Sequence, residues 1–260
     1  MTPWHAHRRN PPPGRSVGAS VTLPPLDSSA LREWERVAAA PVTAGPPTRH
    51  GATWPVKGVR LAARALVVAF LPFLVLVKVA VFFYSHQGYS TVLALASGTA
   101  CTAALVTAYA AWLWHRFTGR VRLALVARRF ALPLVVAYCG YALIYLSSAN
   151  VKSDRVRAYY ASLHPLLRIA LSTLILADRE LVITDLVRGP EAYTAMGLAP
   201  NDGSLHYVQR DGYAHAADLR TAGRGELKNR LVQVYFWSMG FATLRHVGTG
   251  DHLHVELPVR

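Results

Sequence analysis

Cysteine is scarce in this chain, and acidic residues are scarce in its first half. The 260 residues include only two cysteines, Cys101 and Cys139, and both lie inside long apolar runs. This placement excludes an external disulfide framework and a cysteine-based metal site. Residues 1–150 contain 3 Asp and Glu against 15 Lys and Arg, whereas residues 151–260 contain 11 against 13. The net charge of +14 therefore lies almost entirely in the first half.

A basic chain invites the interpretation of a nucleic-acid-binding protein. Here, however, the basic residues alternate with long apolar runs, which is the pattern of membrane topology and not of a phosphate-binding surface. A helix rises about 1.5 Å per residue, so roughly 20 apolar residues cross a bilayer core. The runs lack the polar faces that a helical bundle in water would need. We therefore expect no nucleic-acid partner, a lipid bilayer as partner, and three transmembrane helices over residues 65–84, 91–114 and 131–149.

Two residues in the first run test this expectation. Lys78 lies six residues before the end of the run at Tyr84, so its stem is long enough to carry the ammonium group to the interface. Pro72 is expected to kink the helix and not to end it, because lipid offers the neighbouring residues no better conformation.

The distribution of basic residues predicts the orientation of the spans. The loop between the first two runs, residues 85–90, has no Lys or Arg. By the positive-inside rule, the two basic flanks are cytoplasmic and everything after Asn150 lies outside the cytoplasm. The basic residues concerned are Arg8, Arg9, Arg15, Arg32, Arg36, Arg49, Lys57, Arg60 and Arg64 before the first run, and Arg116, Arg120, Arg122, Arg128 and Arg129 between the second and third.

Composition divides the chain into three parts. Residues 1–60 are expected to form a basic cytoplasmic tail, in which Met1–Gly51, rich in Pro, Gly and Arg, is largely disordered. Residues 61–150 are expected to form the three-helix transmembrane region. Residues 151–260 are expected to form an extracytoplasmic domain.

The extracytoplasmic domain has the pattern of a compact α+β unit. Its first helix resembles a fourth span, but the apolar part is too short to cross a bilayer. β-Branched residues predict one buried strand, and a final hairpin turns at Gly248-Thr249-Gly250. The predicted elements are a helix over 159–178, a strand over 181–184, a short helix opened by Gly189-Pro190-Glu191, a helix over 226–239 ended by Gly240, and hairpin arms over 241–247 and 252–257.

The segment Asp251-His252-Leu253-His254 is the most informative stretch of the chain. Two histidines two residues apart on a strand point to the same side of it. Imidazole is the commonest protein ligand for zinc, and a nearby carboxylate can accept a proton from water at the metal. Upstream, His206 and Asp218 offer one more imidazole and one more carboxylate. Two histidines and a carboxylate as ligands, with an acid left over as base, are the inventory of a catalytic zinc site.

On these residues the domain resembles the zinc D-Ala-D-Ala peptidases. This family comprises D-alanyl-D-alanine carboxypeptidases and dipeptidases, L-alanyl-D-glutamate endopeptidases and penicillin-insensitive murein endopeptidases. The resemblance covers about residues 155–258 and consists of four motifs in the family's order. Residues 182–191 resemble the segment that ends in Ser-x-x-Arg-[Ser/Thr]-x-x-x-Gln, with Arg188 at its arginine; residues 204–206 resemble Ser-x-His, residues 216–219 resemble Ala-x-Asp-[Leu/Ile], and residues 251–254 resemble the Glu-x-x-His or His-x-His segment.

The resemblance implies a fold and a set of roles. The fold is a small α+β domain, also seen in the hedgehog signalling domain, with an antiparallel sheet and flanking helices. The cofactor is Zn²⁺, with His206, Asp218 and His254 as its ligands. Asp251 or His252 is implied as the general base.

Arg188 has two interpretations. The resemblance implies that it stabilises the oxyanion or a carboxylate of the substrate, for which a planar guanidinium is suited. Taken by itself, Arg188 also fits a structural ion pair with Asp185 or Glu191.

The implied function is that of a membrane-anchored zinc metallopeptidase, a carboxypeptidase or endopeptidase acting on peptidoglycan peptides. The predicted topology agrees, since peptidoglycan lies on the side of the membrane where the domain is placed. The expected location is the inner, cytoplasmic membrane of a bacterium.

The spacing of the first two ligands departs from the family pattern. His206 and Asp218 are twelve residues apart where the family usually has seven, so five residues are extra. An inserted turn at residues 210–212 would absorb them. Alternatively, His215 is the ligand in place of His206.

The base also departs from the pattern. Asp251 stands where Glu is usual, which holds the carboxylate about one C–C bond further back, and His252 is the alternative base. Asp185 replaces the usual Ser before the arginine, and the Gln after it is missing. These departures fit a rival function, in which a catalytically weak or inactive member of the family binds a cell-wall peptide or a protein.

Overall fold

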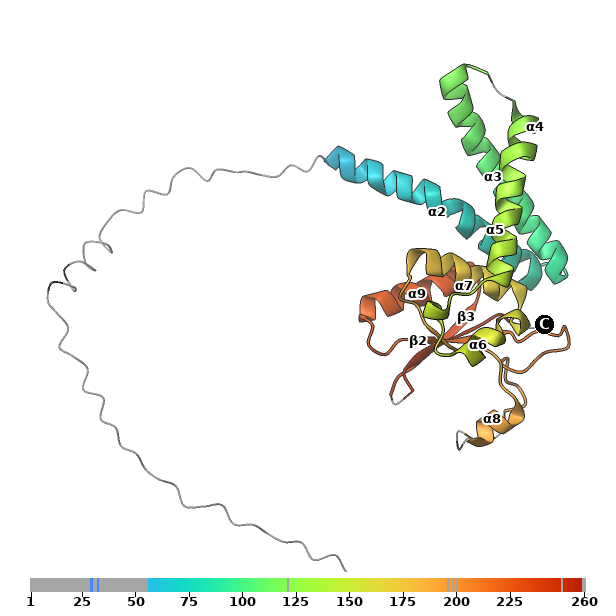
Figure 1. Cartoon of the computed structure of the whole chain (residues 1–260), viewed down its shortest axis with the longest axis vertical. Helices are drawn as coiled ribbons and strands as arrows, with labels where there is room; N and C mark the ends of the chain where they lie inside the picture. The colour runs from blue at the N-terminus through green and yellow to red at the C-terminus, as the bar shows by residue number, and fades with distance from the viewer. Residues whose placement is uncertain are drawn as a thin grey trace, which may run out of the picture. The chain divides into compact units, whose positions relative to one another are not determined.

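The computed structural model describes Ser29, Arg32 and residues 56–258, apart from residues 121, 196, 198, 200 and 249. The predicted disorder of Met1–Gly51 therefore lies outside the described residues, except at Ser29 and Arg32. Two units are distinguished, Met1–Thr53 and Trp54–Arg260. The spans and the C-terminal domain thus belong to one unit (Figure 1).

Three helices are long and apolar enough to cross a membrane, as the sequence predicts. Helix α2 (Val56–Ser85) contains Pro72 without ending there. Helix α3 (Thr91–Thr118) begins at Ser90, whose hydroxyl accepts a hydrogen bond from the Leu93 N–H, and ends at Gly119 with a φ of 69°. Helices α2 and α3 pack against each other, and the buried residues of α2 lie in its C-terminal half.

The third span differs from its predicted bounds of 131–149. It is a continuous helix from Leu123 to Ile144, made of α4 (Leu123–Val126), a π-helical turn (Ala127–Ala131) and α5 (Leu132–Ile144). The prediction placed Arg128 and Arg129 in a loop, but they lie in the π turn. This turn directly precedes Pro133, and a local π adjustment compensates the backbone groups that a proline disturbs.

Below the spans, the domain begins with short helical turns. These are η2 (Ser148–Asn150), α6 (Asp154–Ala158) and η3 (Tyr160–Ser162). The helix predicted over 159–178 is α7 (Pro165–Ala177), which starts six residues later. His164 caps it, because its Nδ1 accepts the Leu166 N–H at 3.3 Å, and Pro165 occupies the first turn. The remaining helices are α8 (Pro190–Ala195) and α9 (Glu226–Met239), which ends at Gly240 with a φ of 103° as predicted.

Four strands form one antiparallel sheet in the order β1-β2-β4-β3. The final hairpin of β3 (Ala242–His246) and β4 (His252–Glu256) is confirmed, and β1 (Ile183–Asp185) begins two residues after the predicted strand. The pattern does not predict β2 (Ala216–Arg220), because four consecutive residues of this central strand are buried and no alternation is left to detect.

The two faces of the sheet have different roles. In β4, Leu253 and Val255 are buried in the core, while His252, His254 and Glu256 lie on the other face. Helices α7 and α9 lie on the core side of the sheet (Figure 1) and share its hydrophobic core. The polar side chains of β4 therefore face away from the helical layer.

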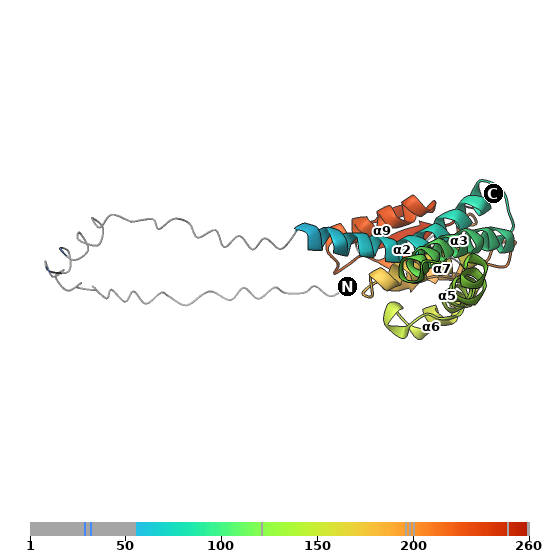
Figure 2. The same cartoon turned by 90° about the horizontal axis from the view of Figure 1, so that it is seen from above.

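The spans rest on this helical layer. The Tyr138 hydroxyl of α5 is hydrogen-bonded to Thr173 Oγ1 of α7 at 2.8 Å. The Arg168 guanidinium donates from α7 to the Leu143 carbonyl near the end of α5 at 2.7 Å. Seen from above, α2, α7 and α9 run side by side (Figure 2). The domain is therefore packed against the spans and not tethered below them.

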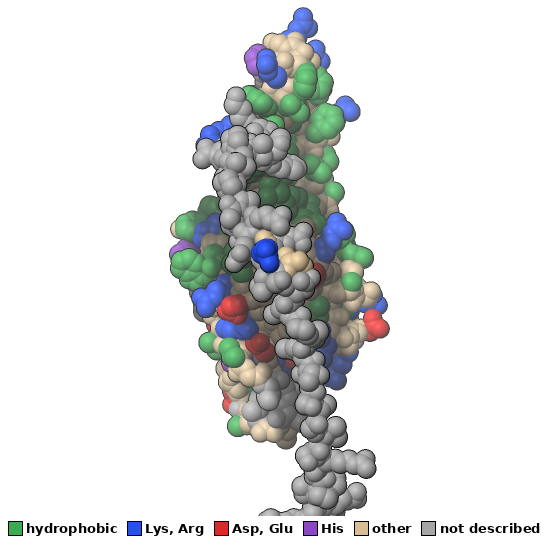
Figure 3. Space-filling view, turned by 90° about the vertical axis from the view of Figure 1, so that its left-hand side faces the viewer, with side chains coloured by type: hydrophobic (Ala, Val, Ile, Leu, Met, Phe, Trp, Pro, Cys, Tyr) green, Lys and Arg blue, Asp and Glu red, His purple; other side chains and the backbone are tan. Residues whose placement is uncertain are grey.

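Lys78 serves this contact. Its Nζ donates to the carbonyl of Ser238, in the last turn of α9, at 2.7 Å. From the sequence alone, the ammonium group is expected to reach the membrane interface. A cation at this end of α9 also suits the negative end of the helix dipole. From Val56 to Asn150 the chain has no acidic residue, and Figure 3 shows acidic side chains only on the lower part of the visible face.

Candidate metal centre

Three side chains converge on one point. His206 lies in the segment between α8 and β2, and Asp218 pairs directly with His254 across the ladder of β2 and β4. Directly paired residues point to the same face of a sheet, so the register itself brings these two together. His206 Nε2 lies 3.2 Å from Asp218 Oδ1 and 3.3 Å from His254 Nδ1, and the latter two atoms are 2.9 Å apart. The three residues predicted as ligands thus form a group able to hold a metal ion.

Outer partners determine which ring nitrogens face the group. His206 Nδ1 donates to the Leu186 carbonyl at 2.9 Å, which leaves Nε2 free to face Asp218. His254 Nε2 faces Glu256 Oε2 at 3.3 Å, which leaves Nδ1 for the group. Histidines that ligate metals donate their second N–H to a carbonyl or carboxylate in this way. Two oriented imidazoles and one carboxylate fit zinc with an open fourth position.

Arg188 contacts the carboxylate oxygen of Asp218 that does not face the histidines. It follows β1, and its terminal nitrogen donates to Asp218 Oδ2 while its Nε donates to Asp185 Oδ2 at 2.6 Å. The guanidinium also lies 5.6 Å from the centre of the Tyr193 ring. The ion pair with Asp185 is therefore present, together with a contact to Asp218. Arg188 leaves the other oxygen of Asp218, Oδ1, directed at the histidines.

The electrostatics favour a cation at this point. Burial raises the pKa of the Asp218 carboxyl, but the adjacent imidazoles of His206 and His254 and the charge of Arg188 outweigh it and hold this pKa well below its usual range. For Arg188, burial lowers the pKa, but the neighbouring carboxylates of Asp218 and Asp185 hold it above its usual range. The carboxylate thus stays ionised, which is the form that binds a metal.

A pocket of about 520 Å³ opens over the group. His252 and His246 line it and stack on each other, with ring centres 4.6 Å apart. His252 Nε2 lies 3.8 Å from Asp218 Oδ1. His252, one of the two predicted bases, is therefore within reach of a small molecule at the group.

Asp251, the other predicted base, is directed elsewhere. One of its oxygens accepts a hydrogen bond from Thr221 Oγ1 at 2.8 Å, and Arg245 donates to both oxygens at 3.0 and 3.1 Å. The hydrogen bond from Thr221 and the ion pair with Arg245 lower the pKa of the Asp251 carboxyl. It is not part of the pocket wall. The structure does not bring Asp251 to the ligands, because the ion pair commits it to bracing the hairpin.

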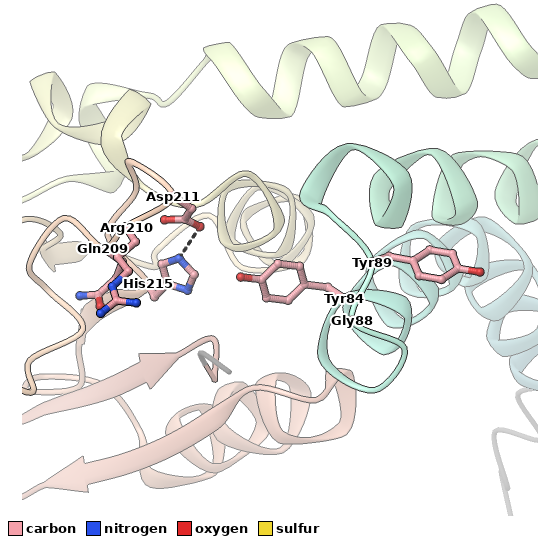
Figure 4. Close-up of a pocket in the computed structure, with 7 residues that line it drawn as sticks. All are labelled: Tyr84, Gly88, Tyr89, Gln209, Arg210, Asp211 and His215. Atoms are coloured by element: carbon pink, nitrogen blue, oxygen red, sulfur yellow. Dashed lines mark hydrogen bonds and ion pairs between the residues drawn. The ribbon is translucent and has the colours of Figure 1, made fainter.

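A second group of histidine and aspartate lies where the domain meets the spans. His215 Nε2 is 2.8 Å from Asp211 Oδ2, and His164 Nε2 is 3.7 Å from the same oxygen. The group borders a cavity of about 390 Å³, into which Tyr84 of α2 points while Tyr89 points away (Figure 4). His215, the alternative ligand, belongs to this group and not to the one around Asp218.

The second group is not built for a metal. His164 Nδ1 already accepts the Leu166 N–H, so the proton of the neutral ring is on Nε2, which lies 3.0 Å from Thr91 Oγ1. A nitrogen that carries a proton has no lone pair for a metal. We assign the group a hydrogen-bonding role that joins the domain to α3.

The inserted turn predicted at residues 210–212 explains the altered spacing. The Gln209 N–H donates to the Tyr213 carbonyl at 2.8 Å, and the Gly212 N–H donates to the Gln209 carbonyl at 2.9 Å. The turn carries Asp211 to His215. The extra residues thus build the contact with the spans and leave His206 at the metal group.

Sequence reasoning missed three polar residues. Glu256 extends the His-x-His pattern by two more positions on the same face of β4, and this spacing is a signal that could have found it. His164 carries no comparable signal, because its partners Asp211 and Thr91 are distant in the sequence. Asp211 lies only four residues from His215, but nothing in the sequence marks the two as a pair.

The buried His164 predicts a pH dependence. Burial and the neighbouring His215 lower its pKa to about 3, below the usual value near 6.5. Between these values the unfolded chain binds a proton that the folded chain excludes. The free energy of unfolding should therefore fall as the pH falls below about 6.5, by up to about 1.4 kcal/mol per pH unit.

We expect His164→Asn to flatten this slope, because asparagine keeps an oxygen acceptor for the helix cap but does not titrate. Denaturant unfolding of the detergent-solubilised chain at several pH values measures it. His86→Asn, at an exposed histidine, is the matched control and should leave the slope unchanged. An unaltered slope in His164→Asn would contradict the assignment.

No protein-family model, no curated protein and no solved structure matches the chain. The resemblance to the zinc D-Ala-D-Ala peptidases therefore rests on the sequence motifs, and the geometry of the group has to be weighed on its own.

Proposed function

We propose that this chain is a membrane-anchored zinc metallopeptidase that hydrolyses stem or cross-link peptides of peptidoglycan. One observation carries the proposal: the ligand atoms of His206, Asp218 and His254 lie 2.9–3.3 Å apart, and their outer partners leave those atoms free. These are the residues that the motifs assign to the metal. The outer acceptors of both histidines are the partners that histidines ligating a metal usually have.

The chemistry follows from the residues around the pocket. When bound, zinc supplies a Lewis acid that polarises a carbonyl and lowers the pKa of water to about 7. His252, on the pocket wall, accepts a proton from the attacking water and returns it to the leaving amine. Its position 3.8 Å from Asp218 supports this role over Asp251.

Arg188 has a double role in this proposal. Its contact with Asp218 orients the metal ligand, and its position in the pocket wall places a fixed positive charge near the substrate. That charge favours a peptide with a free carboxylate or stabilises the developing oxyanion. Such a preference suits the carboxylate-rich stem peptides of the wall.

The placement of the site supports a substrate outside the membrane. The metal group lies on the face of the sheet opposite α7 and α9, which pack against the spans. The proposed orientation, with a cytoplasmic N-terminus in a bacterial inner membrane, rests on the positive-inside rule. It directs the pocket away from the bilayer and toward the wall.

The test uses the whole chain purified in detergent. We expect a bound zinc ion, release of D-alanine or opening of cross-links when muropeptides are added, loss of both on chelation, and recovery on adding zinc. Zinc without hydrolysis, but with binding of muropeptides, would support the rival function of a binding module. A chain that takes up no zinc would contradict the peptidase proposal and leave only a metal-free binding module.

A further inference from the structure

Helix α9 is apolar on two opposite sides, and no described segment of the chain covers one of them. Val232, Phe236 and Met239 are buried toward the sheet. The helical spacing of i, i+4 and i+7 recurs on the other side, where a surface helix in water carries polar residues. This outer stripe consists of Leu227, Leu231, Val234 and Trp237, which are 56–73% exposed.

The end of α9 is fixed against a membrane span. Lys78 of α2 donates to the Ser238 carbonyl, and Gly240 packs so closely that an added Cβ would lie 3.0 Å from Val81 Cγ1. Lys78 lies seven residues before Ser85, the last residue of α2, which is about 10 Å of helix. The end of α9 therefore lies level with the last turns of a span, where lipid surrounds the helix.

A second contact, between α9 and α7, also places α9 at the depth of the last turns of the spans. The Tyr235 hydroxyl of α9 donates to the Ala170 carbonyl of α7 at 2.9 Å. Helix α7 is in turn joined to α5 by the bond between Thr173 and Tyr138, which lies six residues before the end of α5. Two spans thus hold the layer of α7 and α9 at the depth of their last turns.

The outer stripe also points in the right direction. The buried side of α9 packs on β3 and β4, so the stripe faces away from the sheet. Figure 1 shows α7 and α9 between the sheet and the spans, with α2 leaving on the side away from the sheet. The stripe is therefore directed away from the sheet, as is the outgoing part of α2, where the apolar Val67 and Val68 are exposed.

We propose that α9 lies in the membrane interface, with its outer stripe in lipid, and that the partner of this surface is the bilayer that the spans cross. Interfacial helices combine such an apolar face with flanking basic residues and tryptophan. Trp237 supplies the aromatic group. Lys228 and Arg230 form exposed ion pairs with Glu180 and Glu226, and exposed pairs of this kind are weak enough for the long basic side chains to turn to the headgroups instead. The contact of the outer stripe with lipid then adds to the contacts made by α7 and by Lys78, and the three together fix the distance of the domain from the bilayer. This inference does not depend on the metal site.

Spin-label accessibility of the whole chain in phospholipid vesicles tests the proposal. Single cysteines replace Leu231 or Val234 in a background with Cys101→Ser and Cys139→Ala. Arg220→Cys, at the exposed last residue of β2, is the aqueous reference, and Val67→Cys, on α2, is the lipid reference. We expect labels at 231 and 234 to lose collisions with a water-soluble nickel complex and to keep those with oxygen, as at position 67.

The other outcomes overturn the proposal. Nickel collisions at 231 and 234 equal to those at position 220 would place the stripe in water. Loss of collisions with both reagents would mean that protein covers it, such as a second copy of the chain. Both labelled positions are exposed, so folding is preserved, and circular dichroism checks it.

Discussion

His206→Ala is expected to abolish zinc binding by the purified chain, and with it the hydrolysis of muropeptides. His206 is 1% exposed, and its Nε2 faces both other ligand atoms, so an alanine removes one of three ligands and leaves no side chain to replace it. The affinity for zinc should fall by more than the roughly 10- to 100-fold that loss of an outer partner costs. Zinc competition with a chromophoric chelator measures the affinity.

Two further variants calibrate this result. Glu256→Ala removes the outer partner of His254 and should lower the affinity for zinc by roughly 10- to 100-fold. His215→Asn should retain zinc, because His215 belongs to the group at the span junction. If His215→Asn loses the metal and His206→Ala keeps it, the ligand set is wrong and the shorter spacing to Asp218 is right.

His252→Ala is expected to keep zinc and to lose hydrolysis by about 10²- to 10⁴-fold, which is the usual cost of removing a general base. The ring lies on the pocket wall, and its Nε2 is 3.8 Å from Asp218 Oδ1, farther than the 2.9–3.3 Å between the ligand atoms, so the metal group should persist. The loss should appear in kcat more than in KM, because the proton moves only during reaction. Single-turnover hydrolysis with zinc content measured on the same sample separates chemistry from metal loss.

Asp251→Asn is the matched control at the neighbouring position. It breaks the ion pair with Arg245, which should lower stability only slightly, because the pair is partly exposed to solvent, and should leave the rate near that of the parent. The reverse result, in which Asp251→Asn loses hydrolysis and His252→Ala keeps it, would make Asp251 the base. Equal rates in both variants and the parent would refute a base at either position.

The spans and the final hairpin could be predicted because their signals are local. A run of apolar residues such as 65–84 has no stable alternative to a helix in lipid, and Gly248 and Gly250 mark the turn between two alternating strands. The third span was misplaced because the arginines in its π turn look like a loop when only hydropathy is read. Strand β2 was missed because burial on both faces removes alternation.

The identity of the ligands was narrowed by sequence and decided by packing. Spacing left His215 open as an alternative to His206, because neither the twelve residues from His206 to Asp218 nor the three from His215 match the family's usual seven. In the structure, His215 lies away from Asp218, because it is hydrogen-bonded to Asp211 at the junction with the spans. The choice between Asp251 and His252 likewise depended on Arg245, a residue that no motif contains.

By itself, the sequence determined that this protein has three apolar spans, a basic first half and a small α+β domain with two histidines on one strand face, because hydropathy, charge and two-residue alternation are properties of neighbouring residues. Only the tertiary structure decided that His206 joins Asp218 and His254, that Asp251 braces a hairpin, and that the domain rests on the spans through α7 and α9. These outcomes depend on strand register, which sets Arg245 beside Asp251 across the hairpin, and on contacts between residues far apart in the chain, and no local pattern records which partner a side chain meets.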